Sequence, residues 1–123
     1  MAVTYTTAVK NSRLSAVVTA IGATGVLEIG TTAMGTVLAT IPLAATAGTV
    51  SAGVLTLTQA LLDTSADATG TAAAARIRTA TGGTDIITGL TVGTSGSDIN
   101  LNSVSIVAGL EVSITSATIT HAA

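Results

Sequence analysis

The sequence predicts a mainly β protein: a single-domain antiparallel β-sandwich or jelly-roll-like barrel with one N-terminal α-helix. Short apolar segments rich in Val, Ile, Leu and Thr recur along the chain, with glycine- and serine-containing turns between them. One segment near the N-terminus instead spaces its apolar residues as a helix does. A chain of 123 residues can bury one core. We therefore expect one domain over residues 1–123, with a helix at 6–21 and the sandwich at 25–120.

The composition narrows the possible functions. Charged residues make up only 8% of the chain, and four Lys and Arg side chains do not form the basic face of a nucleic-acid binder. Without cysteine, the chain can form neither a disulfide nor a thiolate metal site. Polar residues interrupt every apolar segment before it reaches the length of a spanning helix. We expect no nucleic-acid partner and no membrane association.

The N-terminal helix is predicted from its start, its apolar stripe and its end. Thr6 or Thr7 can cap the first turn, because a threonine hydroxyl accepts from the free N–H groups there. The stripe consists of Leu14, Val17, Val18 and Ile21. Gly22 follows at the position where glycine commonly ends a helix. The helix either packs on the sheet or forms an arm that reaches a neighbouring subunit.

Three strands are expected to follow the helix. They are predicted at residues 26–29, 36–43 and 49–58. Alternation along the first strand directs Glu28 outward, away from the core. Pro42 lacks an N–H group, so it should lie at a sheet edge or a strand terminus. Gly53 lies inside the third strand and is interpreted as a β-bulge.

A β-hairpin turned by Gly82 and Gly83 is the clearest strand signal, because both central residues of a tight turn need positive φ. A two-residue turn sets the pairing. It places Thr81 opposite Thr84, Thr79 opposite Ile86, Ile77 opposite Thr88, Ala75 opposite Leu90 and Ala73 opposite Val92. The other face carries Arg76, Arg78 and Asp85. Arg78 and Asp85 are close enough there for a solvated ion pair.

The C-terminal strands are predicted from the alternation of apolar and polar residues and from the point where this alternation changes phase. Residues 98–102 form a short strand with its isoleucine and leucine inward. Residues 107–109 fit a three-residue hairpin loop, which would pair Ile106 with Leu110. In the last strand the inward set changes phase, and this indicates a bulge near Ser116.

Chemical motifs are scarce. His121 is third from the end of the chain, with no cluster of ligands that the sequence reveals around it. Asp63 and Asp67 could contribute to a weak calcium site, but a solvated loop is the favoured interpretation. Asp98 can cap the turn that precedes it. We expect no enzyme, no catalytic residue, no cofactor and no metal.

Several segments resemble small virion proteins of tailed bacteriophages that are encoded among head-module genes. They are RIR at residues 76–78, TGLTVGTSG at 88–96, DINLN at 98–102 and VSITSATITH at 112–121, with the helix at 7–21 and the strand at 36–40. The resemblance implies a structural protein of the phage particle, specifically a capsid decoration or cement protein that bridges capsomers. It implies the major capsid protein or other virion subunits as partners, and a homo-oligomer.

Two alternatives remain open. One is a neck, collar or tail component of the same particle. The other, of a different class, is a carbohydrate-binding or adhesion module, although the absence of Trp and Phe leaves no large aromatic faces for sugar rings. For the leading interpretation the expected contact residues lie in the two terminal segments and at one sheet edge. They are Ala2, Val3, Thr4, Tyr5, Pro42, Thr118, Ile119, Thr120 and His121.

Overall fold

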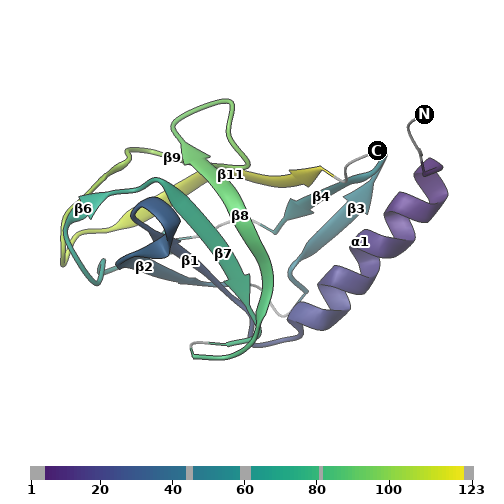
Figure 1. The fold of residues 1–123 in the computed structure, drawn as a ribbon, viewed down its shortest axis with the longest axis horizontal. Coiled ribbons are helices and arrows are strands. Elements are labelled where there is room, and N and C mark those ends of the chain that lie inside the picture. The colour runs from purple at the N-terminus through teal and green to yellow at the C-terminus, as the bar shows by residue number, and fades with distance from the viewer. Residues whose placement is uncertain (1–4, 44–45, 59–61, 81, 121–123) are drawn as a thin grey trace.

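The computed structural model describes residues 5–43, 46–58, 62–80 and 82–120. One helix precedes a series of short strands (Figure 1). The elements are α1 Thr7–Ile21, β1 Val26–Gly30, the 3₁₀ turn η1 Thr32–Met34, β2 Val37–Pro42, β3 Gly48–Ser51, β4 Val54–Leu57, β5 Leu62–Asp63, β6 Gly70–Thr71, β7 Ala74–Arg78, β8 Asp85–Gly93, β9 Ile99–Leu101, β10 Ser105–Ile106 and β11 Val112–Thr120. The predicted class, mainly β with an N-terminal helix, is confirmed.

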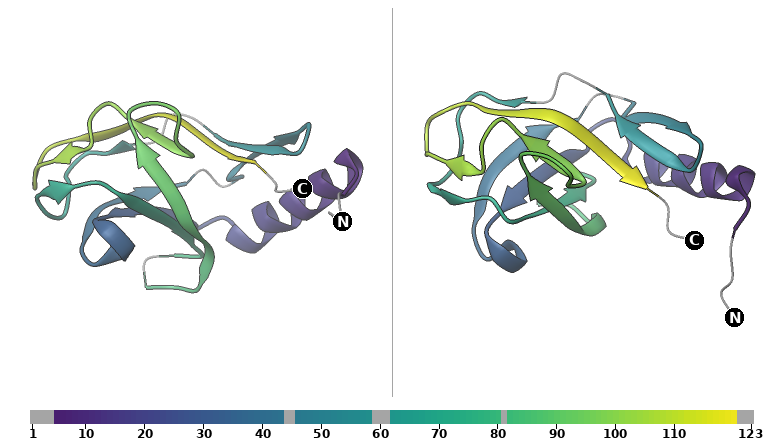
Figure 2. Two further views of the ribbon diagram at one scale, coloured as in Figure 1. Left: turned by 45° about the horizontal axis from the view of Figure 1, so that its top comes forward. Right: turned by 90° about the horizontal axis from the view of Figure 1, so that it is seen from above.

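The strands form one curled sheet and a small satellite pair (Figure 2). The main sheet runs in the order β2-β1-β7-β8-β9-β11-β4-β3, with β5 attached to β11, and β10 pairs with β6. The prediction of purely antiparallel pairing is wrong at one place, because β8 and β9 run parallel with Val92 opposite Ile99. Residues 94–98 double back between these two strands, so the sheet is mixed.

Helix α1 begins and ends where the sequence predicts. The Thr6 hydroxyl accepts from the Val9 N–H at 3.4 Å, and the Gly22 N–H donates to the Val18 carbonyl. Leu14 and Ile21 are buried, and the two valines of the stripe pack against the core. The helix lies on β3, β4 and β8, which is the packed arrangement rather than a detached arm.

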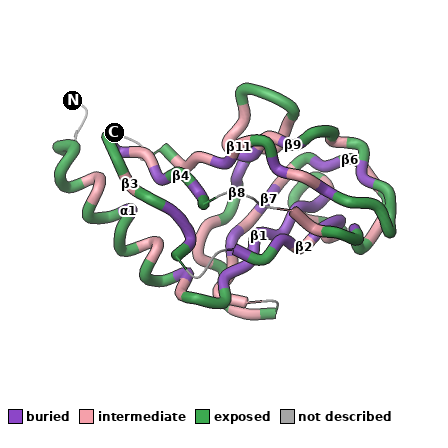
Figure 3. Tube along the Cα trace, turned by 180° about the vertical axis from the view of Figure 1, so that it is seen from behind, coloured by how far each residue is buried: buried purple, intermediate pink, exposed green. Residues whose placement is uncertain are grey.

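The core lies in the middle of the molecule and is aliphatic. Its largest fully buried side chains are Ile21, Leu27, Ile29, Leu38, Ile41, Leu55, Leu57, Ile77, Ile99 and Leu101. Figure 3 shows these buried positions concentrated in the central strands, while much of α1 is exposed. Small β-branched and aliphatic side chains suit closely spaced strands of this kind.

Glu28 corrects the prediction of a solvated outward residue. It does lie on the face of β1 opposite to Leu27 and Ile29, but only 4% of it is exposed. Strand β1 is interior, between β2 and β7, and the arginines of β7 cover the glutamate. A strand with neighbours on both sides can bury both of its faces.

The β7–β8 hairpin has the expected register only at its far end. Ala75 lies opposite Leu90 as predicted, whereas Ile77 lies opposite Ile87 and Arg78 opposite Asp85. Thr79 and Thr84 close a longer loop, in which the Gly83 N–H donates to the Ala80 carbonyl. Two register shifts within β7–β8 make up the difference. The predicted partner Thr81 lies outside the described residues.

The predicted single strand at residues 49–58 is wrong. It is two strands, β3 and β4, joined at Ala52 and Gly53, whose φ angles are 52° and 76°. Positive φ at both positions is the signature of a type I′ hairpin turn. Gly53 therefore marks a turn and not a bulge. The Asn11 side chain of α1 accepts from the Gly53 N–H at 2.8 Å and holds the turn in place.

The predicted pairing of Ile106 with Leu110 is also wrong. Ile106 lies opposite Gly70 of β6, and the Ala66 backbone bonds both the Gly109 N–H and the Leu110 carbonyl of the 107–110 turn. Gly109 does have the positive φ expected for it, 85°. In β11 the predicted bulge is confirmed, because the register against β9 shifts between Ile114 and Ser116.

Candidate functional surfaces

A charged network occupies the outer face of β1, β7 and β8. Arg76 Nε donates to Glu28 Oε1 at 2.6 Å, and Arg78 Nη1 lies 3.6 Å from the same oxygen. Arg78 Nε lies 2.8 Å from Asp85 Oδ1, although its N–H is not aimed well enough to make a hydrogen bond. The predicted Arg78–Asp85 ion pair is confirmed. Both arginines are already engaged in these contacts within the molecule. The network therefore stabilises the packing of β1, β7 and β8.

The aspartates near β5 hold a loop against the edge of β2. Asp63 Oδ2 accepts from the Thr40 N–H at 3.1 Å, and Asp67 Oδ2 accepts from the Thr40 hydroxyl at 3.2 Å. The Asp67 N–H donates to the Leu38 carbonyl at 2.7 Å. These contacts bond the edge backbone of β2 at Leu38 and Thr40, and Pro42 ends the strand.

A polar cluster fixes the loop between β8 and β9. Asp98 Oδ2 accepts from both the N–H and the hydroxyl of Thr91, at 3.0 and 3.1 Å. Asn100 bonds both the N–H and the carbonyl of Ser97, and its amide donates to the Ser116 hydroxyl at 2.8 Å. Contrary to the prediction, the Asp98 side chain does not cap the turn that precedes it but bonds Thr91 of β8 on the other side of the loop.

The predicted contact residues fall in separate places. Tyr5 is 39% exposed just before α1, and the Arg13 guanidinium lies 4.5 Å from its ring centre. Pro42 is exposed at the end of β2. Thr118, Ile119 and Thr120 lie within β11 and pair with β4. Ala2, Val3, Thr4 and His121 lie outside the described residues.

Large apolar side chains are exposed at two separate sites. Val9 is 43% exposed on α1, close to Tyr5, while Val107 and Leu110 are 44% and 59% exposed in the turn between β10 and β11. Sequence reasoning missed these three aliphatic residues. The false pairing of Leu110 with Ile106 gave the leucine a partner that it does not have.

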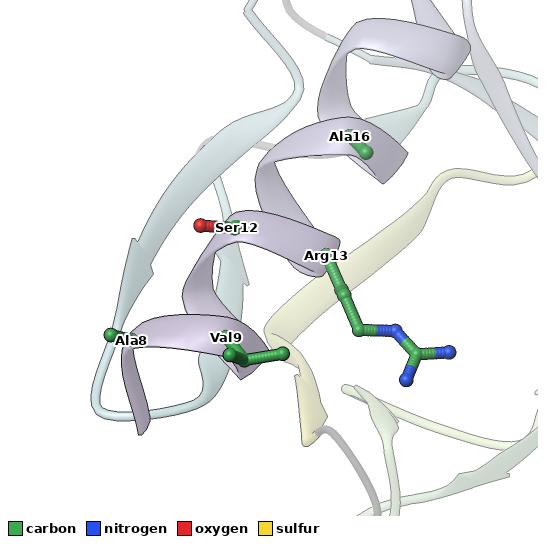
Figure 4. A pocket seen from close by; sticks show the side chains of 5 residues that line it. All are labelled: Ala8, Val9, Ser12, Arg13 and Ala16. Carbon is green, nitrogen blue, oxygen red and sulfur yellow. The ribbon is translucent and has the colours of Figure 1, made fainter. Parts of the chain in front are cut away.

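The surface of α1 near Val9 is hollowed. A shallow depression of about 360 Å³ is lined by Ala8, Val9, Ser12, Arg13 and Ala16 (Figure 4). In Figure 4, the Arg13 side chain extends away from the helix beside Val9. The small side chains leave room for an apolar group, and the guanidinium favours a negative charge next to that group.

The described residues do not assemble a recognisable reaction centre. Within them, no three His, Cys, Asp or Glu side chains come together as a metal ion would require. The described part of the chain also holds no helix with the length and apolarity to cross a membrane. Comparisons with protein-family models, curated proteins and solved structures find no match. Function must therefore be inferred from the chain's own surfaces.

Proposed function

We propose that this protein is a structural subunit of a tailed-phage particle, a decoration or cement protein that binds the assembled capsid and bridges capsomers. The observation that carries the proposal is the exposure of aliphatic side chains at two distant sites, around Val9 and around Leu110. Such apolar side chains are removed from water when a partner covers them, which favours association. The resemblance of the strand and turn segments to small phage virion proteins supplies the type of assembly.

A bridging role needs two contact surfaces on one small body. The N-terminal half of α1 and the turn next to β6 lie at opposite ends of the long axis (Figures 1 and 2). Each contact can be weak, because many copies on one shell act together. A subunit that binds the shell better than its separate parts stabilises the shell by mass action.

Binding to emptied capsids tests this role. The purified protein should cosediment with capsids but not with unassembled capsid protein, and it should raise the temperature at which the shells open. Leu110→Ser should weaken cosedimentation, whereas Thr88→Ser, at an exposed site on β8, should not. Equal binding to assembled and unassembled protein, or none to either, would reject the cement role.

A neck or tail component is the second candidate, because the same two exposed sites also fit this role. Contacts at opposite ends of a subunit suit a ring or a tube. The copy number in purified particles separates the two roles. A number that matches the capsid lattice supports decoration, a number that matches a single ring supports the neck or tail, and absence rejects both.

A further inference from the structure

The turn between β10 and β11 displays apolar side chains on a fixed backbone. We define residues 107–111 as the apical loop. The Ala108 N–H donates to the Thr69 hydroxyl at 3.0 Å, and the Gly109 N–H donates to the Ala66 carbonyl at 2.9 Å. The Leu110 carbonyl in turn accepts from the Ala66 N–H at 2.8 Å. A loop held this firmly loses little conformational entropy when its side chains dock.

The opposite end of the molecule carries a shallow depression with apolar and cationic lining. The depression on α1, which we call the α1 hollow, is lined by alanine, valine and serine around Arg13. It belongs to a helix anchored by the Asn11 contact to Gly53 and by buried Leu14. Both partners of a contact between the apical loop and the α1 hollow are therefore preorganised.

The two ends carry charges of opposite sign, which also suits a contact between them. Helix α1 carries Lys10 and Arg13 and no acidic residue. The segments 62–71 and 102–113 at the other end carry Asp63, Asp67 and Glu111 and no basic residue. Among the described residues neither Arg13 nor Glu111 has an ion-pair partner, although the Arg13 guanidinium lies against the Tyr5 ring. Leu110 and Glu111 are neighbours in the apical loop. In the same way, the apolar lining of the α1 hollow lies next to the Arg13 guanidinium.

We propose that copies of this chain associate end to end: the apical loop of one copy docks into the α1 hollow of the next. Leu110 fills the apolar part of the hollow, and Glu111 pairs with Arg13. The two surfaces lie too far apart in one molecule to meet each other (Figure 1). The contact joins different surfaces, so it repeats along a line of subunits and closes into a ring where the rotation permits. The contact uses the same two surfaces as the proposed bridging of capsomers, but its occupant is a second copy, so its test needs no capsid.

Charge exchange tests the contact in the full-length protein. The mass of the wild-type protein, measured by light scattering after size exclusion, should rise with concentration above the 11.8 kDa monomer. Arg13→Glu alone and Glu111→Arg alone each place like charges across the contact, and each should weaken association at least about tenfold. An equimolar mixture of the two variants places opposite charges across every contact, so it should regain the wild-type mass.

Two controls separate loss of the contact from unrelated effects of an added charge or of misfolding. Thr88→Arg adds a charge at an exposed position of β8 and should leave the mass unchanged. Circular dichroism of each variant should match the wild-type spectrum. The proposal is overturned if the wild-type protein stays monomeric at every concentration, or if the mixture of folded variants stays monomeric. A response to Arg13→Glu but not to Glu111→Arg would also overturn it, because that pattern belongs to a symmetric pairing of α1 helices.

Discussion

The middle of the molecule and its two ends use their side chains in opposite ways. In the middle, Glu28 is buried and is contacted by Arg76 and Arg78, and the apolar residues beneath β1 and β7 are fully covered. At the ends, Arg13 and Glu111 have no ion partner among the described residues, and Val9 and Leu110 face solvent. The chain has only four basic and six acidic residues, so this division is pronounced.

This difference indicates that the middle of the molecule determines its stability and that its two ends determine its association. Groups already paired inside one molecule gain nothing from a neighbour, whereas exposed apolar groups on a fixed backbone gain burial when a neighbour arrives. We therefore expect substitutions in the middle to change the free energy of unfolding and substitutions at the ends to change assembly.

Glu28→Ala should have the largest effect on folding. It leaves Arg76 and Arg78, whose side chains are 23% and 21% exposed, without their central carboxylate. Removing one partner of a buried ion pair costs about 3–5 kcal/mol, and partial exposure of the arginines points to the lower value, about 3 kcal/mol. Urea unfolding followed by circular dichroism measures this loss, and the association of the folded fraction should be unchanged.

Asp85→Ala is the matched control for that loss. The Asp85 side chain is 43% exposed, and solvent-exposed ion pairs contribute at most about 1 kcal/mol. If the two substitutions destabilise the protein equally, the network is not centred on Glu28, and the contrast between the buried middle and the exposed surface fails there.

Asn11→Ala should have an intermediate effect. The Asn11 side chain joins α1 to the β3–β4 turn by accepting from the Gly53 N–H, and a bond of this kind contributes about 1 kcal/mol. Hydrogen exchange should show faster opening in the β3–β4 turn and α1 than in β1 and β7. Asn11→Asp keeps the acceptor oxygen and should preserve the protection, whereas uniform loss over the whole sheet would show that α1 is not a separate unit.

Leu110→Ser should have the smallest effect on folding. The side chain is 59% exposed, and surface substitutions usually change the free energy of unfolding by less than about 0.5 kcal/mol. Association should nevertheless be strongly weakened. A loss of stability as large as that of Glu28→Ala would show that the apical loop serves the fold, against the division proposed here.

Local patterns predicted the elements whose signals are contained in a few neighbouring residues. The cap at Thr6, the stripe and Gly22 defined α1, and the slip of alternation located the bulge at Ser116. The prediction failed where distant segments compete for the same backbone. Ile106 had a plausible local partner in Leu110, but β6 occupies that position, and no sequence pattern reveals such a choice.

The candidate surfaces were predictable only in part. Charge counts indicated few functional ionisable groups, but Glu28 was assigned to solvent because alternation gives the face of a residue and not what covers it. The α1 hollow was not predictable, because Ala8, Ser12 and Ala16 look like ordinary helix residues. The exposure of Leu110 follows from the pairing of β10 with β6, which is a property of the whole fold.

The most direct test blocks one end at a time. Leu110→Ser removes the docking side chain but keeps the α1 hollow, and Val9→Glu places a carboxylate in the hollow but keeps the apical loop. Each variant should sediment as a monomer, and an equimolar mixture should form complexes of two copies and nothing larger, because only one contact per pair remains. A mixture that stays monomeric, or that assembles as far as the wild-type protein, would contradict the account.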